Sequence, residues 1–203
     1  MCSKPTFMRL YYIRHGLTDW NATGRLQGHH DVPINAMGRA QAARSADILG
    51  DLLTRDACAA ADLDYVSSPL VRARETMEIM RATLGLAPTR YGVDPRLTEI
   101  GFGEWEGLTY GEVMQREPDV VAKREADKWL FRPPGGENYL QVAERVAAWY
   151  ATLRRDTVVC AHGGTGRALI AALDVAPSEQ AVHRDIDQGV VYVFEKSRLT
   201  CYD

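Results

Sequence analysis

Largely apolar runs alternate with amphipathic stretches along this chain. Phe7–Ile13 and Thr157–Ala161 are rich in aromatic or β-branched residues and contain no proline, which is typical of strands buried on both faces of a sheet. The alternation of such runs with helical stretches predicts an α/β fold with an open sheet. Further short strands are predicted at Leu63–Ser67, Arg90–Val93, Gly189–Phe194 and Leu199–Tyr202.

The stretches between these runs carry helical periodicity. A helix over residues 35–53 is predicted, with Asn35 as its N-cap. Its apolar stripe is formed by Ala36, Ala40, Ala43, Ala46 and Leu49. A second helix is predicted to open at Leu70, after Ser68-Pro69. The strongest amphipathic pattern lies in Tyr139–Arg154, whose predicted buried face includes Leu140, Val142, Val146 and Trp149.

Residues 107–138 have a different character from the segments around them. Thr109–Arg116 and Val121–Trp129 are predicted to be helical pieces with a break at Pro118, and Arg132–Asn138 is a Pro- and Gly-rich loop. We interpret residues 107–138 as a cap-like insertion that closes over the sheet edge. No linker or repeat interrupts the chain, so residues 1–203 are predicted to form one domain with this insertion.

Composition narrows the range of functions. A net charge of −3 without a basic stripe argues against a nucleic-acid partner. No apolar run approaches the roughly 20 residues that span a bilayer, and Met1–Arg9 lacks the pattern of a signal peptide. Four widely spaced cysteines without a C-x-x-C pair are typical of reduced thiols. We therefore expect a cytoplasmic protein with neither a membrane nor a nucleic-acid partner, and oligomeric state stays open.

Two predicted strands end in a histidine followed by glycine. Arg14-His15-Gly16 follows the first strand, and His162-Gly163-Gly164 follows the strand Thr157–Ala161. Ligands of open α/β sheets bind at the carboxyl ends of the strands. One strand-end histidine is usually structural, but two of them make a shared site more probable. An arginine beside a histidine favours a small anionic substrate, with the imidazole free to act as nucleophile or base.

Arg72 lies in the first turn of the second predicted helix. Helix N-termini favour anions, and a guanidinium matches phosphate oxygens in a bidentate way. The alternative is a solvated helix charge, and we assign Arg74 to that class. The segment Leu97–Gly107 adds three glutamates, one of which could protonate a leaving oxygen. By number alone, two of the three are expected to be ordinary surface or structural charges.

Several of these segments together resemble a known family. Arg14–Asn21 with Arg25–Gly28 and Asp31–Ile34, then Ser67–Thr76, the pattern Leu97-x-Glu99 before Phe102–Gly107, and His162–Arg167 are similar to motifs of the histidine phosphatase superfamily, in its phosphoglycerate-mutase-like phosphatase branch. One departure is Leu17, where many members carry glutamate. The resemblance covers most of the chain and implies a three-layer sandwich, with a mostly parallel central sheet and helices on both faces.

The resemblance also implies roles for individual residues. His15 would attack phosphorus, Glu99 would act as acid and then base, and His162 would bind and orient the phosphate; Glu104 and Glu106 would be structural or rim residues. Arg14 and Arg72 would hold phosphate oxygens, with Asn21 and the Gly163 N–H as further donors. Gln27 and Gly28 would contact the substrate. The implied enzyme is a phosphomonoesterase acting through a phosphohistidine on a small phosphorylated metabolite, without cofactor or metal.

Two alternatives stay open at this point. A cofactor-dependent phosphoglycerate mutase would share the phosphohistidine but return the phosphoryl group to a sugar acid. A non-catalytic protein that binds a phosphorylated ligand would keep the fold, although it would usually have lost His15 or Glu99. A metallophosphatase is not favoured, because His29, His30 and His183 lack ligand-like spacing. The physiological substrate cannot be read from the sequence.

Overall fold

A computed structural model describes residues 8–203 of the chain. Over these residues the strands form one six-stranded sheet in the order β3-β2-β4-β1-β5-β6. Neighbours from β3 to β1 are parallel, whereas the pairs β1–β5 and β5–β6 are antiparallel. The strands are β1 (Arg9–Arg14), β2 (Asp64–Ser67), β3 (Gly92–Val93), β4 (Thr157–Ala161), β5 (Val191–Glu195) and β6 (Arg198–Tyr202).

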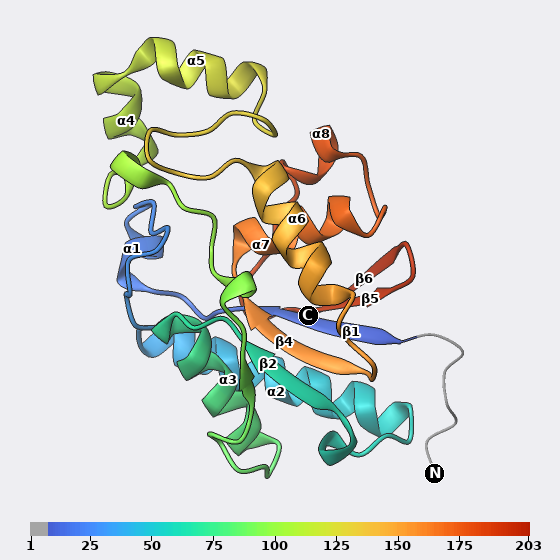
Figure 1. Ribbon diagram of the computed structural model, residues 1–203. Coiled ribbons are helices and arrows are strands. Elements are labelled where there is room, and N and C mark those ends of the chain that lie inside the picture. Colours follow the sequence, from blue (N-terminus) through green and yellow to red (C-terminus); the bar gives the residue numbers. More distant parts are fainter. Residues whose placement is uncertain (1–7) are drawn as a thin grey trace.

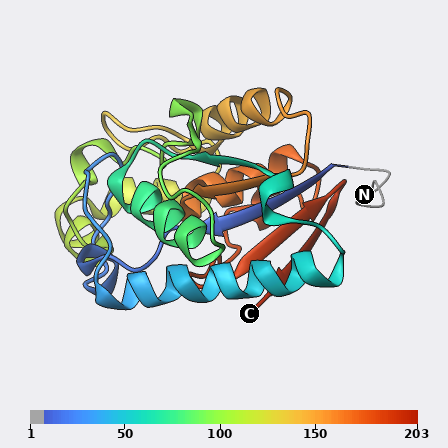
Figure 2. The same cartoon turned by 90° about the horizontal axis from the view of Figure 1, so that it is seen from below.

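Helices cover both faces of this sheet, which confirms the predicted α/β sandwich (Figures 1 and 2). α2 (Ala36–Arg55) and α3 (Val71–Thr83) lie on one face, and α6 (Tyr139–Tyr150) and α7 (Gly163–Ala172) lie on the other. The remaining helices are α1 (Asp19–Ala22), α4 (Tyr110–Arg116), α5 (Pro118–Ala126), α8 (Ser178–Ala181) and the 3₁₀ turns Ala60–Asp62, Pro95–Leu97 and Gly103–Trp105.

Alternate residues of the central strands feed two separate cores. Leu10 and Tyr12 pack toward α6 and α7, whereas Tyr11 and Ile13 pack toward α2 and α3. Side chains of a strand point to opposite faces in turn, so a strand covered on both faces needs apolar residues throughout. This explains why β1 and β4 read as continuous apolar runs.

Three strand ends meet at one edge of the sheet. Arg14, the last residue of β1, pairs with Ala161 at the end of β4, and Ser67 of β2 pairs with Cys160 of β4. The three strands are parallel, so the residues that follow them emerge side by side. These residues are His15, Ser68 and His162.

The structure corrects several local predictions. The buried face of α2 is formed by Gly38, Ala42, Ser45, Ala46, Leu49, Leu52 and Leu53, so the predicted stripe through Ala36 and Ala40 was wrong. Leu140 is 40% exposed rather than buried. Pro118 begins α5 as its first residue, where proline needs no N–H partner. α7 begins at Gly163, directly after His162, so Gly163, Gly164 and Gly166 lie in its first two turns.

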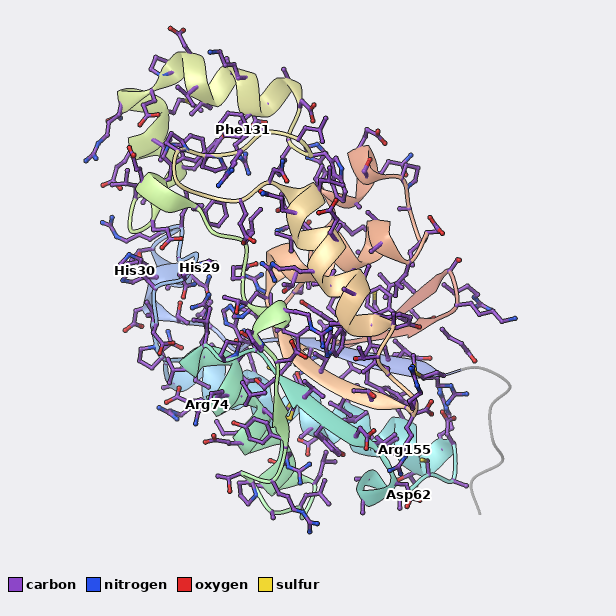
Figure 3. The ribbon with its side chains drawn as sticks, viewed as in Figure 1. His29, His30, Asp62, Arg74, Phe131 and Arg155 are labelled. Carbon is purple, nitrogen blue, oxygen red and sulfur yellow. The ribbon has the colours of Figure 1, made fainter. Side chains whose placement is uncertain are left out.

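The insertion forms a small unit at the end of the molecule where the strands of the site terminate. α4 and α5 lie together away from the sheet (Figure 1). Trp105, Val113 and Val121 form their own buried cluster, with Phe131 stacked on Trp105 at 5.6 Å between ring centroids. Phe131 lies under α5 in Figure 3. Whether residues 107–138 close over a substrate stays a prediction.

Other predictions concern the N-terminal segment, the cysteines and a membrane-spanning helix. Phe7 and Cys2 lie outside the described residues, and so does most of Met1–Arg9. Within the described part of the chain, Cys58, Cys160 and Cys201 form no disulfide with one another. Among residues 8–203, no helix has both the length and the apolar character needed to cross a bilayer.

Candidate active site

The structure brings the two strand-end histidines together. The rings of His15 and His162 lie 5.1 Å apart between centroids, and the two residues are 2% and 0% exposed. Each follows directly on a strand of the parallel part of the sheet. The two histidines are almost 150 residues apart in the sequence. The pairing of β1 with β4 brings them next to each other.

A backbone contact orients the ring of His15. Its Nδ1 lies 2.8 Å from the carbonyl oxygen of Gly16. A carbonyl can only accept, so Nδ1 carries the proton and the lone pair belongs to Nε2. The N–H of Gly16 donates to Thr76 Oγ1 at 3.0 Å, and a Cβ on Gly16 would lie 2.2 Å from the oxygen of Gly38. The close approach of two backbones therefore requires glycine after His15.

His162 is held by two side chains. Arg72 Nε donates to its Nδ1 at 3.2 Å, so Nε2 carries the proton and donates to Ser68 Oγ at 2.7 Å. The main chain of His162 is fixed as well, because its N–H donates to Thr165 Oγ1 at 2.9 Å. In this geometry His162 accepts a hydrogen bond from Arg72 and so helps to hold it. The Nε2–H of His162 could donate to a phosphate only if it turned away from Ser68.

Arg72 is fully buried beneath the site, with 0% exposure. Besides the bond to His162, its Nη1 donates to His30 O at 2.7 Å and its Nη2 donates to Gly28 O at 2.8 Å. A guanidinium has five N–H donors, so one donor on each Nη stays available for an anion. A buried cation without a partner anion is costly, which makes this position suitable for a phosphate.

Arg14 carries a further unsatisfied donor. Its Nη1 donates to Ile186 O at 2.8 Å, whereas its Nε is buried and has no partner among the described residues. Buried N–H groups are rarely left without an acceptor. The orphaned Nε points to a ligand at this place.

Burial and charge keep both histidines neutral. Burial, followed by the charges of Arg72 and Arg14, holds the pKa of His15 well below 6.5. The pKa of His162 is lowered in the same way, first by burial and then by Arg72. Burial also lowers the pKa values of Arg14 and Arg72 from their usual range. A neutral His15 keeps its Nε2 lone pair near pH 7, as a nucleophile requires.

The Glu99 carboxyl group lies beside the first turn of α7, next to the histidines. Its Oε1 accepts the N–H of Ile100 at 2.9 Å, and its Oε2 accepts the N–H of Gly164 at 3.3 Å. Gly164 lies in the first turn of α7, next to Gly163. The carboxyl group is thus anchored at the helix N-terminus beside the histidines.

Three residues that the sequence did not identify support Glu99. Arg145 Nη2 and His29 Nε2 lie 3.2 and 3.0 Å from the carbonyl oxygen of Glu99. Glu137 binds Arg145 at 3.1 Å and accepts the N–H of Gly101 at 2.9 Å. Burial opposes its charge, but bonds from His29 and Arg145 lower the pKa of Glu137 to about 2. A glutamate eight residues before Arg145 gave no signal by itself, because the contact depends on tertiary structure.

The remaining predicted site residues lie in the segments that follow the first strand. Asn21 Oδ1 accepts from Thr18 and from Gln188 Nε2 at 3.1 Å, so only its Nδ2 remains to donate. Gln27 is 6% exposed, and its Oε1 has no partner among the described residues. Gly28 has a positive φ of 48° and gives its carbonyl to Arg72.

Glu106 braces the loop that supports Arg72. Its Oε1 accepts the N–H of His29 at 3.1 Å and that of Phe102 at 3.0 Å. His29 and His30 lie on the loop after α1, labelled in Figure 3. Glu104 is exposed. Among residues 8–203, no three histidine, cysteine or acidic side chains gather as metal ligands would.

Comparisons with known proteins identify relatives of the chain. The model of the histidine phosphatase superfamily (branch 1) matches residues 10–199. Glucosyl-3-phosphoglycerate phosphatase of Mycobacterium tuberculosis is 36% identical over 179 residues, which cover 81% of this chain and 74% of that protein. A 2,3-bisphosphoglycerate-dependent phosphoglycerate mutase of Gloeobacter violaceus is 27% identical over 193 residues, covering 92% and 84%.

Solved structures give the same picture. The α-ribazole phosphatase from Shigella flexneri superimposes with a TM-score of 0.78 at 28% identity, covering 96% of this chain and 95% of that one. The native mycobacterial glucosyl-3-phosphoglycerate phosphatase gives 0.77 at 31% identity, covering 92% and 89%.

Proposed function

The chain belongs to the histidine phosphatase superfamily, and from this membership we propose that it is a metal-independent phosphomonoesterase acting through a phosphohistidine on a small phosphorylated metabolite. One observation carries the proposal. A buried, neutral His15 has its proton fixed on Nδ1 by Gly16, and unsatisfied donors of Arg14 and Arg72 surround it. A nucleophile placed beside unpaired guanidinium donors suits phosphoryl transfer.

In the first step, His15 Nε2 attacks phosphorus in line with the leaving oxygen. The P–N bond forms while the P–O bond breaks, and Glu99 gives its proton to the departing alcohol. In the second step, Glu99 takes a proton from water as the water oxygen attacks phosphorus. The P–N bond then breaks, and inorganic phosphate and neutral His15 are released.

The surrounding groups stabilise the charge on the transferring phosphoryl group. Arg14, Arg72 and the N–H of Gly163 hold its equatorial oxygens, each charge-assisted bond contributing about 1.5–3 kcal/mol. His162 keeps Arg72 in place through its Nδ1. We assign Asn21 to phosphate binding as a further donor, and Gln27 and Gly28 to substrate contacts.

The phosphatase reading is better supported than the mutase alternative. The relatives named as phosphatases reach 36% identity, whereas the mutases compared are 27–28% identical. The non-catalytic alternative is disfavoured because His15, Glu99 and both arginines are present and assembled. Relatives act on glucosyl-3-phosphoglycerate and α-ribazole phosphate by their names, so a small metabolite is the proposed substrate class. The cytoplasmic location and the lack of a nucleic-acid partner remain predictions.

Phosphate release from 4-nitrophenyl phosphate with EDTA present tests this function. The wild type is compared with His15→Ala and with His183→Ala, a matched control because His183 is exposed and outside the site. We expect EDTA-resistant turnover in the wild type and in His183→Ala, and none in His15→Ala. Turnover that EDTA abolishes, or that survives in His15→Ala, would overturn the proposal.

A further inference from the structure

A cavity of about 600 Å³ lies beside β2, away from the candidate active site. The beginning of β2, the end of α3 and the segment between α3 and β3 line it. Arg72 lies in the first turn of α3 and Arg81 in its last turn, about 13 Å apart along the helix axis. Figure 3 shows Arg155, another residue of the lining, well away from His29 and His30. The cavity is therefore separate from the place where the histidines meet.

Arg81 is buried at this cavity with most of its donors free. It is only 6% exposed. Its guanidinium carbon lies 4.4 Å from the centre of the Tyr65 ring, and its Nε donates to Ala87 O at 3.0 Å. These two contacts fix the guanidinium plane, but the four N–H groups on its Nη atoms have no acceptor among residues 8–203. Because a buried cation without an anion is costly, the free donors point to a ligand in the cavity.

Arg90 brings a second unpaired guanidinium to the same cavity. Its backbone N–H donates at 3.3 Å to Ala87 O, the oxygen that also accepts Arg81 Nε. Neither arginine forms an ion pair within the described part of the chain. The other charged residues of the lining, Arg155 and Asp64, pair with each other at 3.4 Å. Two positive charges of the lining are therefore left unbalanced.

The rest of the cavity wall is largely apolar. Leu63, Leu86 and the ring of Tyr91 contribute to it. The neighbouring carboxylate of Glu78 is already engaged, because it accepts the Tyr91 hydroxyl at 2.8 Å and lies 4.0 Å from Arg74. An anion that pairs with Arg81 would therefore come from outside the described chain.

We propose that this cavity is a second anion site, at which Arg81 and Arg90 bind a phosphate group, either free or carried by a small organic molecule. A guanidinium presents paired N–H groups that match phosphate oxygens, and two guanidinium groups match the double negative charge. The volume of the cavity is in the range of sites that hold small metabolites. The site uses none of the residues assigned to phosphoryl transfer, so the inference does not depend on the proposed function.

Backbone amide NMR of the wild-type protein reads the two sites separately. The protein is titrated with inorganic phosphate and with phenylphosphonate, whose C–P bond resists phosphatases. We call residues 86–92 the cavity amides, and Gly163 and Gly164 the active-site amides. We expect the cavity amides to shift with saturation. Tighter binding of phenylphosphonate there assigns the cavity to organic phosphates, whereas equal binding assigns it to free phosphate, and both results support an anion site.

Three variants show whether the two arginines carry the binding. Arg90→Met removes an exposed guanidinium, and Arg81→Lys keeps the charge but loses the paired donors. Each should weaken binding at the cavity amides by about tenfold or more, the value of one charge-assisted bond, and leave the active-site amides unchanged. Arg44→Met, which removes an exposed arginine of α2, is the control and should change neither. Cavity amides that respond to neither probe, or that respond in either cavity variant as in the wild type, overturn the inference, whether or not the protein is a phosphatase.

Discussion

Replacing Gly164 with alanine should impair the acid without disturbing the nucleophile. An alanine Cβ at this position would lie 2.4 Å from Glu99 Oε1 and 2.6 Å from Ile100 Cγ2. Ordinary contacts begin near 3.5 Å, so the Glu99 carboxylate must move by about 1 Å. Different contacts hold His15: its ring donates to the carbonyl oxygen of Gly16, and the N–H of Gly16 donates to Thr76.

The magnitude follows from the displacement. A misplacement of about 1 Å can cost on the order of 10²-fold in rate, and a general acid contributes about 10²–10⁴-fold. We therefore expect kcat for an alkyl phosphate to fall by about 10²-fold in Gly164→Ala. A weakly basic leaving group such as 4-nitrophenolate needs little protonation, so formation of the phosphohistidine from its ester should be much less affected.

Steady-state kinetics on the two esters, with burst-phase measurement of 4-nitrophenolate, provide the assay. Gly111→Ala is the control, since a Cβ there meets only Thr109 Oγ1 at 4.0 Å. Glu99→Gln tests whether the effect passes through the acid. If Gly164→Ala acts through Glu99, adding it to Glu99→Gln should cost little more. If the losses in kcat from Gly164→Ala and Glu99→Gln add fully, or if Gly164→Ala lowers turnover of both esters equally, the reasoning is refuted.

Other predictions concern stability. Burial and nearby guanidinium groups lower the native pKa values of His15 and His162, so the unfolded chain binds more protons below pH 6.5. The free energy of unfolding should be independent of these imidazoles above pH 6.5 and fall below it, approaching about 1.4 kcal/mol per pH unit for each; urea titrations at several pH values measure the slope, and a flat profile would contradict it. Glu137→Gln should destabilise by about 1.5–3 kcal/mol because the partly buried Arg145 loses its carboxylate partner and keeps only carbonyl acceptors, seen as a lower urea midpoint; an unchanged midpoint would show that the pair contributes nothing. Trp105→Ala should cost about 3–5 kcal/mol in the same titration, and a loss below 1 kcal/mol would mean that the insertion core repacks.

The ends of the strands were predictable because a physical discontinuity marks them. β4 matches its predicted range, Thr157–Ala161, since a run buried on both faces changes abruptly to polar and glycine residues. The parallel order then brings His15 and His162 to one edge. Arg72 could be predicted because it lies in the first turn of the helix that follows β2.

Other features of the structure could not be predicted from the sequence, for physical reasons. Alanine fits either face of a helix, so the stripe proposed for α2 had no energetic contrast, and the buried face passes instead through Gly38 and Ala42. Arg145 and His29 support Glu99 through its carbonyl oxygen, which no sequence pattern records. The bond from His162 to Ser68 likewise depends on the tertiary arrangement.

Direct detection of the phosphorylated residue tests the central claim. The Glu99→Gln variant, in which activation of water is lost, is mixed with 4-nitrophenyl phosphate and quenched in alkaline denaturant, where phosphohistidine is stable. Peptide mass spectrometry then locates the phosphoryl group. We predict that it lies on His15 and is absent from the Glu99→Gln, His15→Ala double variant. A phosphoryl group on another residue, or wild-type turnover without any labelled His15, would contradict the account.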